Sequence, residues 1–122
     1  MKKIVFMGTP LFAVPILKSI FSKGYNIPLV YTQPPSKSNR GHKVSKSPIH
    51  KFCEENNLKV RTPENFNNLD DEKIILEKLE ADIAIVVAYG QILPKGILDV
   101  CEKGFINIHA SLLPKLRGAA PI

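Results

Sequence analysis

Continuous apolar runs, separated by long stretches of mixed polarity, constrain the fold of this chain more than any other feature. Three of them lie at Lys3 to Met7 (KIVFM), Ile27 to Thr32 (IPLVYT) and Asp82 to Ala88 (DIAIVVA). Runs of this kind, without polar alternation, are typical of strands buried on both faces of a parallel sheet. Two further strands are expected at Lys59 to Arg61 and at Phe105 to His109.

Helices are expected between these strands. The first follows Gly8, with Thr9 as its cap and Pro10 at its first position, and it ends at Lys23 before Gly24. The other predicted helices span Pro48 to Asn57, Glu72 to Leu79 and Ile97 to Glu102. Alternating strands and helices predict an α/β fold with a mostly parallel, Rossmann-like sheet.

The composition narrows the class of protein. With 122 residues, of which 44% are hydrophobic, the chain can bury a core of its own. No apolar run reaches the roughly 18–20 residues that a membrane-spanning helix needs. The isolated cysteines Cys53 and Cys101 favour a reducing compartment, and we expect a cytoplasmic protein. His42 and His50 lie near Cys53, but their spacing matches no zinc pattern, so no metal is expected.

Charge is distributed unevenly along the chain. Residues 1–53 contain nine Lys or Arg and no acidic residue, whereas residues 54–122 contain eight basic and eleven acidic residues. Such asymmetry favours a polyanionic partner, above all nucleic acid, although a basic surface that only aids solubility explains it equally well.

The connection from Gln33 to Lys51 carries five cations and no acid, and it is much longer than the usual link in an α/β unit. We expect a long structureless loop that binds phosphates, and the alternative is a solvated loop without a partner. Its candidate phosphate ligands are Lys37, Arg40, Lys43 and Lys46.

Three short polar motifs follow predicted strands. They are Gly8-Thr9-Pro10, Tyr89-Gly90 and Asn107-x-His109, and in a parallel sheet they meet at the edge where ligands bind. The first turn lacks the glycine spacing of a dinucleotide site and the Gly-Lys-Ser/Thr of a P-loop. Neither type of nucleotide site is therefore expected.

Asn107 and His109 are two positions apart on a strand, so their side chains project from the same face. An amide and an imidazole aimed at one point can hold a carbonyl oxygen and the oxyanion that forms from it. No nucleophile with a neighbouring base accompanies them, which favours direct transfer between two substrates.

Several separated motifs resemble one enzyme family. The pattern Asn107-x-His109-x-Ser111-Leu112-Leu113-Pro114-x-x-Arg117-Gly118 resembles the signature of formyltransferases that use 10-formyltetrahydrofolate. Within that group, three segments are most similar to methionyl-tRNA formyltransferases: Gly8-Thr9-Pro10-x-Phe12-Ala13, Ala88 to Pro94 (AYGQILP), and Arg117 to Ile122 (RGAAPI).

The resemblance implies transfer of a formyl group from 10-formyltetrahydrofolate to the amino group of initiator methionyl-tRNA. Asn107 would hold the formyl oxygen and His109 would stabilise the oxyanion. The folate would contact Ser111, Leu112, Leu113 and Pro114, as well as Tyr89, Gly90, Gln91, Ile92 and Leu93 through their backbone groups. The basic connection would contact tRNA, with Arg40-Gly41 matching the central Arg-Gly of the family's insertion.

The resemblance also implies that residues 1–122 are the amino-terminal part of the formyltransferase domain. The rest of that domain, including an aspartate beyond the histidine, and a carboxyl-terminal β-barrel that binds tRNA would lie outside these residues. We therefore expect a catalytically impaired chain whose incomplete sheet edge favours self-association.

Three alternatives stay open at this point. One is a formyltransferase that acts on a sugar-nucleotide amine, which shares the Asn-x-His and Ser-Leu-Leu-Pro patterns. A glycinamide ribonucleotide formyltransferase fits less well, because its first turn is richer in Gly and Ser. The third is a module that binds folate or RNA without catalysis.

Overall fold

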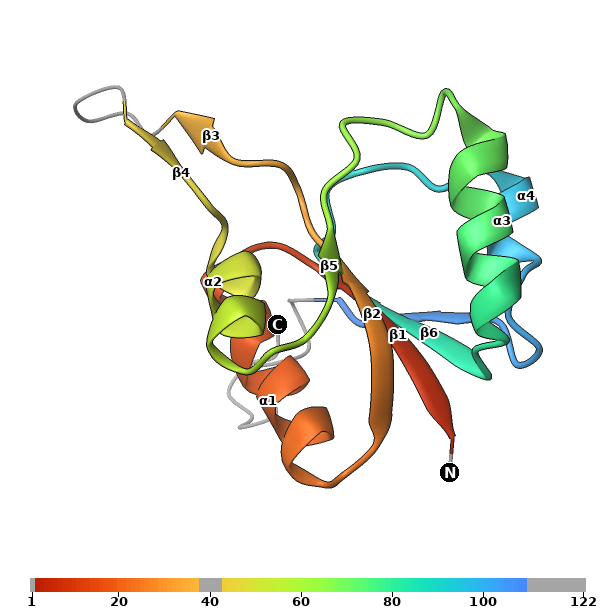
Figure 1. The fold of residues 1–122 in the computed structure, drawn as a ribbon, viewed down its shortest axis with the longest axis horizontal. Helices are drawn as coiled ribbons and strands as arrows, with labels where there is room; N and C mark the ends of the chain where they lie inside the picture. Colours follow the sequence, from red (N-terminus) through yellow and green to blue (C-terminus); the bar gives the residue numbers. More distant parts are fainter. Residues whose placement is uncertain (1, 38–42, 110–122) are drawn as a thin grey trace.

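The computed structural model describes residues 2–37 and 43–109, and its central layer is a five-stranded sheet (Figure 1). In spatial order the strands are β5 (Val60–Arg61), β2 (Asn26–Tyr31), β1 (Lys3–Gly8), β6 (Ile83–Val87) and β7 (Phe105–Asn107). Every pairing in this sheet is parallel, as the Rossmann-like prediction requires. The strand order reverses between β1 and β6, and such switch points are where α/β sheets bind ligands.

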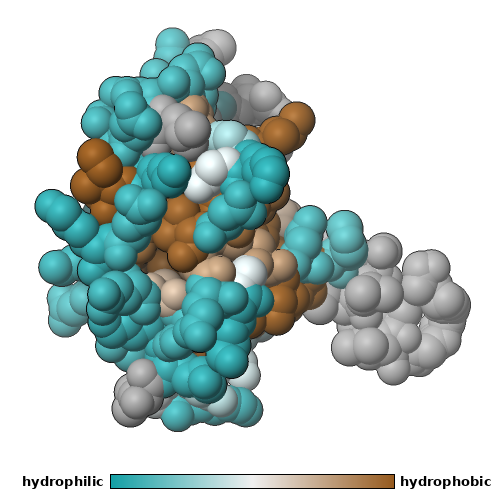
Figure 2. Space-filling model, turned by 90° about the vertical axis from the view of Figure 1, so that its right-hand side faces the viewer, coloured by the Kyte–Doolittle hydropathy of each residue, from teal (hydrophilic) through white to brown (hydrophobic). Residues whose placement is uncertain are grey.

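The helices cover both faces of the sheet, as Figure 1 shows. One face carries α1 (Val14–Ser22) and α2 (Pro48–Glu55). The opposite face carries α3 (Leu69–Leu79) and the short α4 (Lys95–Leu98). On the side of the molecule that carries α3 and α4, hydrophobic atoms are visible between hydrophilic ridges (Figure 2).

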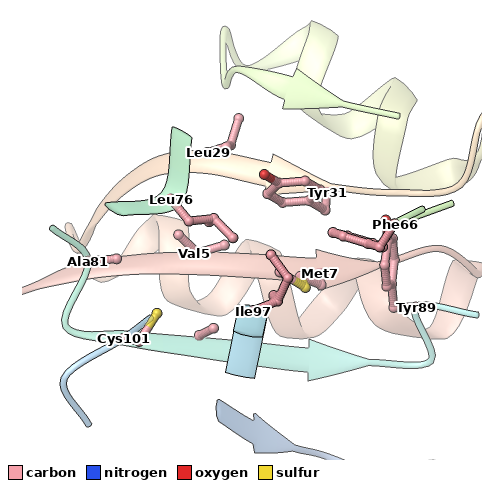
Figure 3. Close-up of a cluster of buried hydrophobic side chains, with 11 residues drawn as sticks. Val5, Met7, Leu29, Tyr31, Phe66, Leu76, Ala81, Tyr89, Ile97 and Cys101 are labelled. Atoms are coloured by element: carbon pink, nitrogen blue, oxygen red, sulfur yellow. The ribbon is translucent and has the colours of Figure 1, made fainter. Parts of the chain in front are cut away.

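The central strand β1 explains why its sequence is apolar without a break. Val5 and Met7 belong to the core under α3 and α4 (Figure 3), whereas Phe6 belongs to the core under α1 and α2. All three side chains are fully buried, because successive residues of a strand point to opposite faces and both faces are covered here.

Gly8 ends β1 in a space that has no room for a side chain. A Cβ there would lie 2.8 Å from a ring carbon of Phe6 and 2.9 Å from the carbonyl oxygen of Val87. The glycine thus lets the end of β1 approach β6 closely, next to the ligand edge of the sheet.

A buried carboxylate ties α3 to the sheet. Glu72 accepts hydrogen bonds from the hydroxyl of Tyr31 (2.7 Å) and from the Arg61 guanidinium (2.8 and 2.9 Å). Burial opposes its ionisation, but these hydrogen bonds and the charge of Arg61 outweigh burial and lower the pKa of Glu72. Burial, followed by the hydrogen bond to Glu72, raises the pKa of Tyr31. Helix α3 is thus anchored across β2 and β5.

Several helix boundaries differ from the prediction. The first helix begins with a 3₁₀ turn, η1 (Leu11–Ala13), and α1 follows only at Val14. Helix α3 begins at Leu69 and not at Glu72, with three acidic residues in its first turn, where they suit the helix dipole. Helix α4 spans Lys95–Leu98 instead of Ile97 to Glu102. The strands, in contrast, lie within two residues of their predicted positions.

Candidate active site

A cavity of about 420 Å³ opens at the carboxyl ends of β6 and β7. The residues that line it are Val86, Ala88, Tyr89, Gly90, Gln91, Ile92, Asn107, Ile108 and His109. Two predicted motifs, the segment after β6 and the Asn-x-His after β7, therefore border the same space. This is the edge where ligands bind in parallel α/β sheets.

Asn107 and His109 form the wall that continues β7. Asn107 is the last residue of the strand and is paired with Val86 of β6. The strand was predicted to reach His109, yet only one further ladder bond forms, from the Ile108 amide to the Val86 carbonyl oxygen at 2.8 Å. Ile108 packs against the core under α1 and α2, so its neighbours project to the other side. An amide and an imidazole, both exposed, thus share one cavity wall.

The opposite wall is the segment of residues 88–92. Its backbone leaves β6 through two left-handed residues, Ala88 (φ 50°) and Gly90 (φ 97°). The Tyr89 ring is buried in the core, edge-on to the rings of Tyr31 and Phe66 (Figure 3). Ile92, in contrast, is 94% exposed at the cavity. The wall is therefore anchored by Tyr89 and presents an apolar side chain at Ile92.

The Tyr89 hydroxyl belongs to the core rather than to the chemistry of the cavity. It is buried and has no hydrogen-bond partner in the described part of the chain. Burial, with a smaller contribution from the charge of Glu72, raises the pKa of Tyr89, so the phenol stays neutral at physiological pH.

A second, more apolar cavity of about 330 Å³ adjoins the first. Its lining residues are Val86, Gln91, Ile92, Leu93, Leu98, Phe105 and Asn107, of which Val86, Gln91, Ile92 and Asn107 also line the first cavity. The two form one cleft with an apolar lobe and a polar lobe. Such a cleft suits a flat ligand whose reactive group points toward Asn107 and His109.

Four side-chain hydrogen bonds fix residues 89–91 to neighbouring segments. Two of them end on backbone carbonyl oxygens of this segment: Thr9 Oγ1 donates to Tyr89 (2.8 Å) and Gln33 Nε2 donates to Gly90 (2.9 Å). The other two start from the Gln91 side chain, whose Nε2 donates to Gln33 Oε1 (3.0 Å) and to the Pro63 carbonyl oxygen (2.8 Å). The cleft wall is therefore tied to the ends of β1, β2 and β5.

The prediction for Thr9 was wrong, and Gln33 was missed. Thr9 does not cap a helix, because its hydroxyl donates across the sheet to Tyr89. Gln33 stood out in the sequence only as the first residue of the basic connection. The one available signal was its place directly after a predicted strand, at the ligand edge of the sheet.

The basic connection between β2 and α2 contains a small antiparallel hairpin of β3 (Ser36–Lys37) and β4 (Val44–Ser45). The expectation of a structureless loop was therefore wrong. Lys37 and Lys43 are exposed on the hairpin, which projects from the body of the molecule (Figure 1). Lys46 is ion-paired with Glu54 of α2, so its charge is partly compensated.

The base of the hairpin is fixed by a pair of hydroxyl groups. The Thr32 hydroxyl, fully buried, lies 2.6 Å from that of Ser47. Ser47 in turn caps α2 by accepting a hydrogen bond from the His50 amide (3.0 Å). Both ends of the basic connection are thus attached to the sheet edge beside the cleft.

Some predicted site residues lie outside the described part of the chain, namely Arg40 and Ser111, Leu112, Leu113 and Pro114. His42 of the rejected metal cluster lies outside it as well. Within residues 2–37 and 43–109, no group of three or more His, Cys, Asp or Glu side chains could hold a metal ion. The described helices include none that is long and apolar enough to span a membrane.

Comparison with known proteins gives consistent results. The family described as formyl transferase matches residues 1–122. A methionyl-tRNA formyltransferase of Pelagibacter ubique is 62% identical over 121 residues, covering 99% of this chain and 39% of the relative. A methionyl-tRNA formyltransferase of Paramagnetospirillum magneticum is 49% identical over 120 residues, covering 98% of this chain and 39% of the relative. The chain thus spans about two fifths of the length of these relatives.

Among solved structures, a phosphoribosylglycinamide formyltransferase from Streptococcus pneumoniae TIGR4 matches with a TM-score of 0.59 and 18% identity. The match covers 94% of this chain and 60% of that chain. At this level of identity the likeness supports the fold alone.

Proposed function

The chain belongs to the formyl transferase family, and on that premise we propose that it serves in transferring a formyl group from 10-formyltetrahydrofolate to initiator methionyl-tRNA. The observation that carries the proposal is the cleft that joins Asn107 and His109 to residues 88–92. The substrate is inferred from the names of the relatives, and the role in translation implies a cytoplasmic protein. We further propose that residues 1–122 form the amino-terminal part of the catalytic domain.

In this reaction the amine nitrogen of methionine bonds to the formyl carbon, and the bond from that carbon to N10 of the folate breaks. The amine loses a proton and N10 gains one. A tetrahedral intermediate with a negatively charged oxygen lies between the two states, and fixed hydrogen-bond donors stabilise it. We assign the Asn107 amide to the formyl oxygen and the His109 ring to the developing oxyanion.

The two lobes of the cleft suggest how the formyl donor lies. Leu93, Leu98 and Phe105 give the second lobe an apolar lining that fits a flat ring system. The first lobe then receives the formyl group beside Asn107 and His109. Ser111, Leu112, Leu113 and Pro114 remain part of the proposed folate site, together with Tyr89, Gly90, Gln91 and Ile92.

The basic hairpin is proposed to contact the tRNA backbone. Lys37 and Lys43 are exposed, and among the residues that the structure describes neither takes part in an ion pair, so both can approach phosphates. Arg40 completes this set, and Lys46 contributes less because Glu54 competes for its charge. The hairpin leaves the sheet at the edge that carries the cleft. The cleft and the hairpin can therefore contact the aminoacylated end of the tRNA and its phosphates from one side.

The proposal is tested by measuring formyl transfer from 10-formyltetrahydrofolate to initiator methionyl-tRNA by the 122-residue chain, with His109→Ala beside it. We expect transfer to fall by about 10²–10³ in the variant, as is typical when one oxyanion-stabilising donor is removed. Transfer that is above background and equal in both chains would reject the assigned role of His109.

A second measurement keeps the proposal testable where turnover of the chain is low. Calorimetric titration with 5-formyltetrahydrofolate, a stable analogue of the donor, reports binding in the cleft directly. We expect Leu98→Arg, which places a charge in the apolar lobe, to abolish binding. Unchanged binding in this variant would reject the cleft as the folate site.

A further inference from the structure

We propose that Gln33 is a positioning residue of the cleft, and that its carboxamide holds residues 89–91 in the conformation that forms the cavity wall. The inference rests on the proposed function, because it gives Gln33 a part in binding the formyl donor. Gln33 lies two residues after β2 and is absent from the lining of both lobes. Its influence on a ligand would therefore pass through the wall that it contacts.

Gln33 uses both halves of its amide on consecutive residues of this wall. Nε2 donates to the Gly90 carbonyl oxygen at 2.9 Å, and Oε1 accepts from the Gln91 side chain at 3.0 Å. A carboxylate could make only the second contact, and an aliphatic side chain could make neither. The backbone amide of Gln33 also donates to Thr9 Oγ1 at 3.3 Å, which itself donates to the Tyr89 carbonyl oxygen.

The contact between Gln33 and Gly90 is so close that a side chain at position 90 would displace the Gln33 carboxamide from its hydrogen bonds. A Cβ on Gly90 would lie 2.5 Å from Nε2 of Gln33. The positive φ of 97° at Gly90 is also one that other residues rarely adopt. The sequence at position 90 is therefore fitted to the side chain at position 33, although 57 residues separate them.

The wall needs such support because its backbone is strained. Ala88 adopts a left-handed conformation (φ 50°) that is unfavourable for a residue with a Cβ. Strained conformations persist where surrounding contacts over-determine them. Gln33 and Thr9 supply contacts of this kind on the two carbonyl oxygens that follow Ala88.

The experiment uses three variants of the 122-residue chain. Gln33→Leu removes both side-chain contacts at nearly constant size, and Gln33→Glu keeps only the acceptor. Asn26→Leu is the matched control, because it removes an exposed amide at the other end of β2. Two quantities are measured for each: hydrogen exchange of the peptide that covers residues 88–92, and the dissociation constant for 5-formyltetrahydrofolate.

We expect Gln33→Leu to speed exchange within residues 88–92 and to weaken binding about tenfold, as for the loss of two hydrogen bonds, one exposed and one partly buried. Gln33→Glu should bind weakly at pH 7.5 and recover toward the wild-type affinity near pH 4, because a carboxyl group is mostly protonated only below its ordinary pKa of about 4.3 and can then again donate to Gly90. A purely structural role of Gln33 would give no such recovery. Asn26→Leu should change neither quantity.

The outcomes separate this inference from the proposed function. Wild-type affinity and exchange in Gln33→Leu would overturn the positioning role and leave the proposed function standing. If the wild-type chain does not bind the analogue, the folate proposal fails, and exchange in residues 88–92 alone decides the role of Gln33. If Gln33→Leu does not fold, the pH-dependent recovery of Gln33→Glu supports the role, and its absence overturns it.

Discussion

The cleft wall of residues 88–92 and the basic hairpin of β3 and β4 both leave the carboxyl edge of the sheet, but they are held in different ways. Four side-chain hydrogen bonds and a buried tyrosine fix the wall. The hairpin has two pairs of facing residues, all exposed. A small ligand that must present one atom to a hydrogen-bond donor needs preorganised contacts, whereas phosphates can be attracted by charges on an exposed hairpin.

The comparison predicts that the same Val→Ala substitution has a large effect on stability beside the wall and a small one on the hairpin. Val87 is fully buried at the end of β6, beside the wall. Val87→Ala should lower the free energy of unfolding by about 2–3 kcal/mol, because the substitution leaves a cavity in the core. Val44→Ala on the hairpin should change it by less than about 0.5 kcal/mol. Urea unfolding of both variants measures these values, and equal losses would remove the distinction between the regions.

Two carboxylates in different surroundings, the buried Glu72 of α3 and the exposed Glu54 of α2, should also be distinguished by acid. The pKa of Glu72 is lowered in the folded chain, so its stabilisation is complete above the unfolded value of 4.5 and is lost as the pH falls through the folded value. Glu72→Gln should therefore cost about 1–2 kcal/mol at pH 7 and progressively less below about pH 4.5.

Glu54→Gln provides the matched control for this measurement. Glu54 pairs with Lys46 at the exposed base of the hairpin, where solvent screens the interaction. Chemical denaturation between pH 7 and pH 3 should show little change in this variant. A pH profile of Glu72→Gln that runs parallel to the wild type would contradict the assignment of the buried carboxylate.

The hairpin should respond to charge and not to packing. Changing Lys37 and Lys43 together to Gln should weaken initiator tRNA binding about tenfold near 0.1 M salt and reduce the salt slope by about two, with no change in melting temperature. Lys46→Gln should have a smaller effect, because Glu54 already compensates its charge. Filter binding across a salt series measures both, and an unaltered slope would exclude the hairpin from the phosphate contacts.

The sheet could be predicted from the sequence because its signal is local. Ile4 to Met7 is apolar throughout, and only a strand covered on both faces buries such a run. The meeting of Asn107 and His109 with residues 88–92 followed from topology, since parallel strands share one carboxyl edge. Local pattern and a single topological rule were sufficient for these features.

Other features depend on contacts that sequence pattern does not contain. Thr9 suits a helix cap by residue type, but the carbonyl oxygen of Tyr89, 80 positions away, takes its hydrogen bond. Gln33 contacts Gly90, 57 positions away, so nothing near Gln33 in the sequence marks its role. The strands of the hairpin have two residues each and little apolar character, and no periodicity can develop over that length.

The position of β1 at the centre of the sheet affects when this strand can pair during synthesis of the chain. Lys3 at its start bonds to Asp82, 79 positions later, just ahead of β6. At synthesis rates of about 5–20 residues per second, roughly 4–16 s pass between the emergence of these two residues. During that interval one edge of β1 lacks its partner strand β6. The strand that organises the finished sheet is therefore the one that a nascent chain must shield the longest.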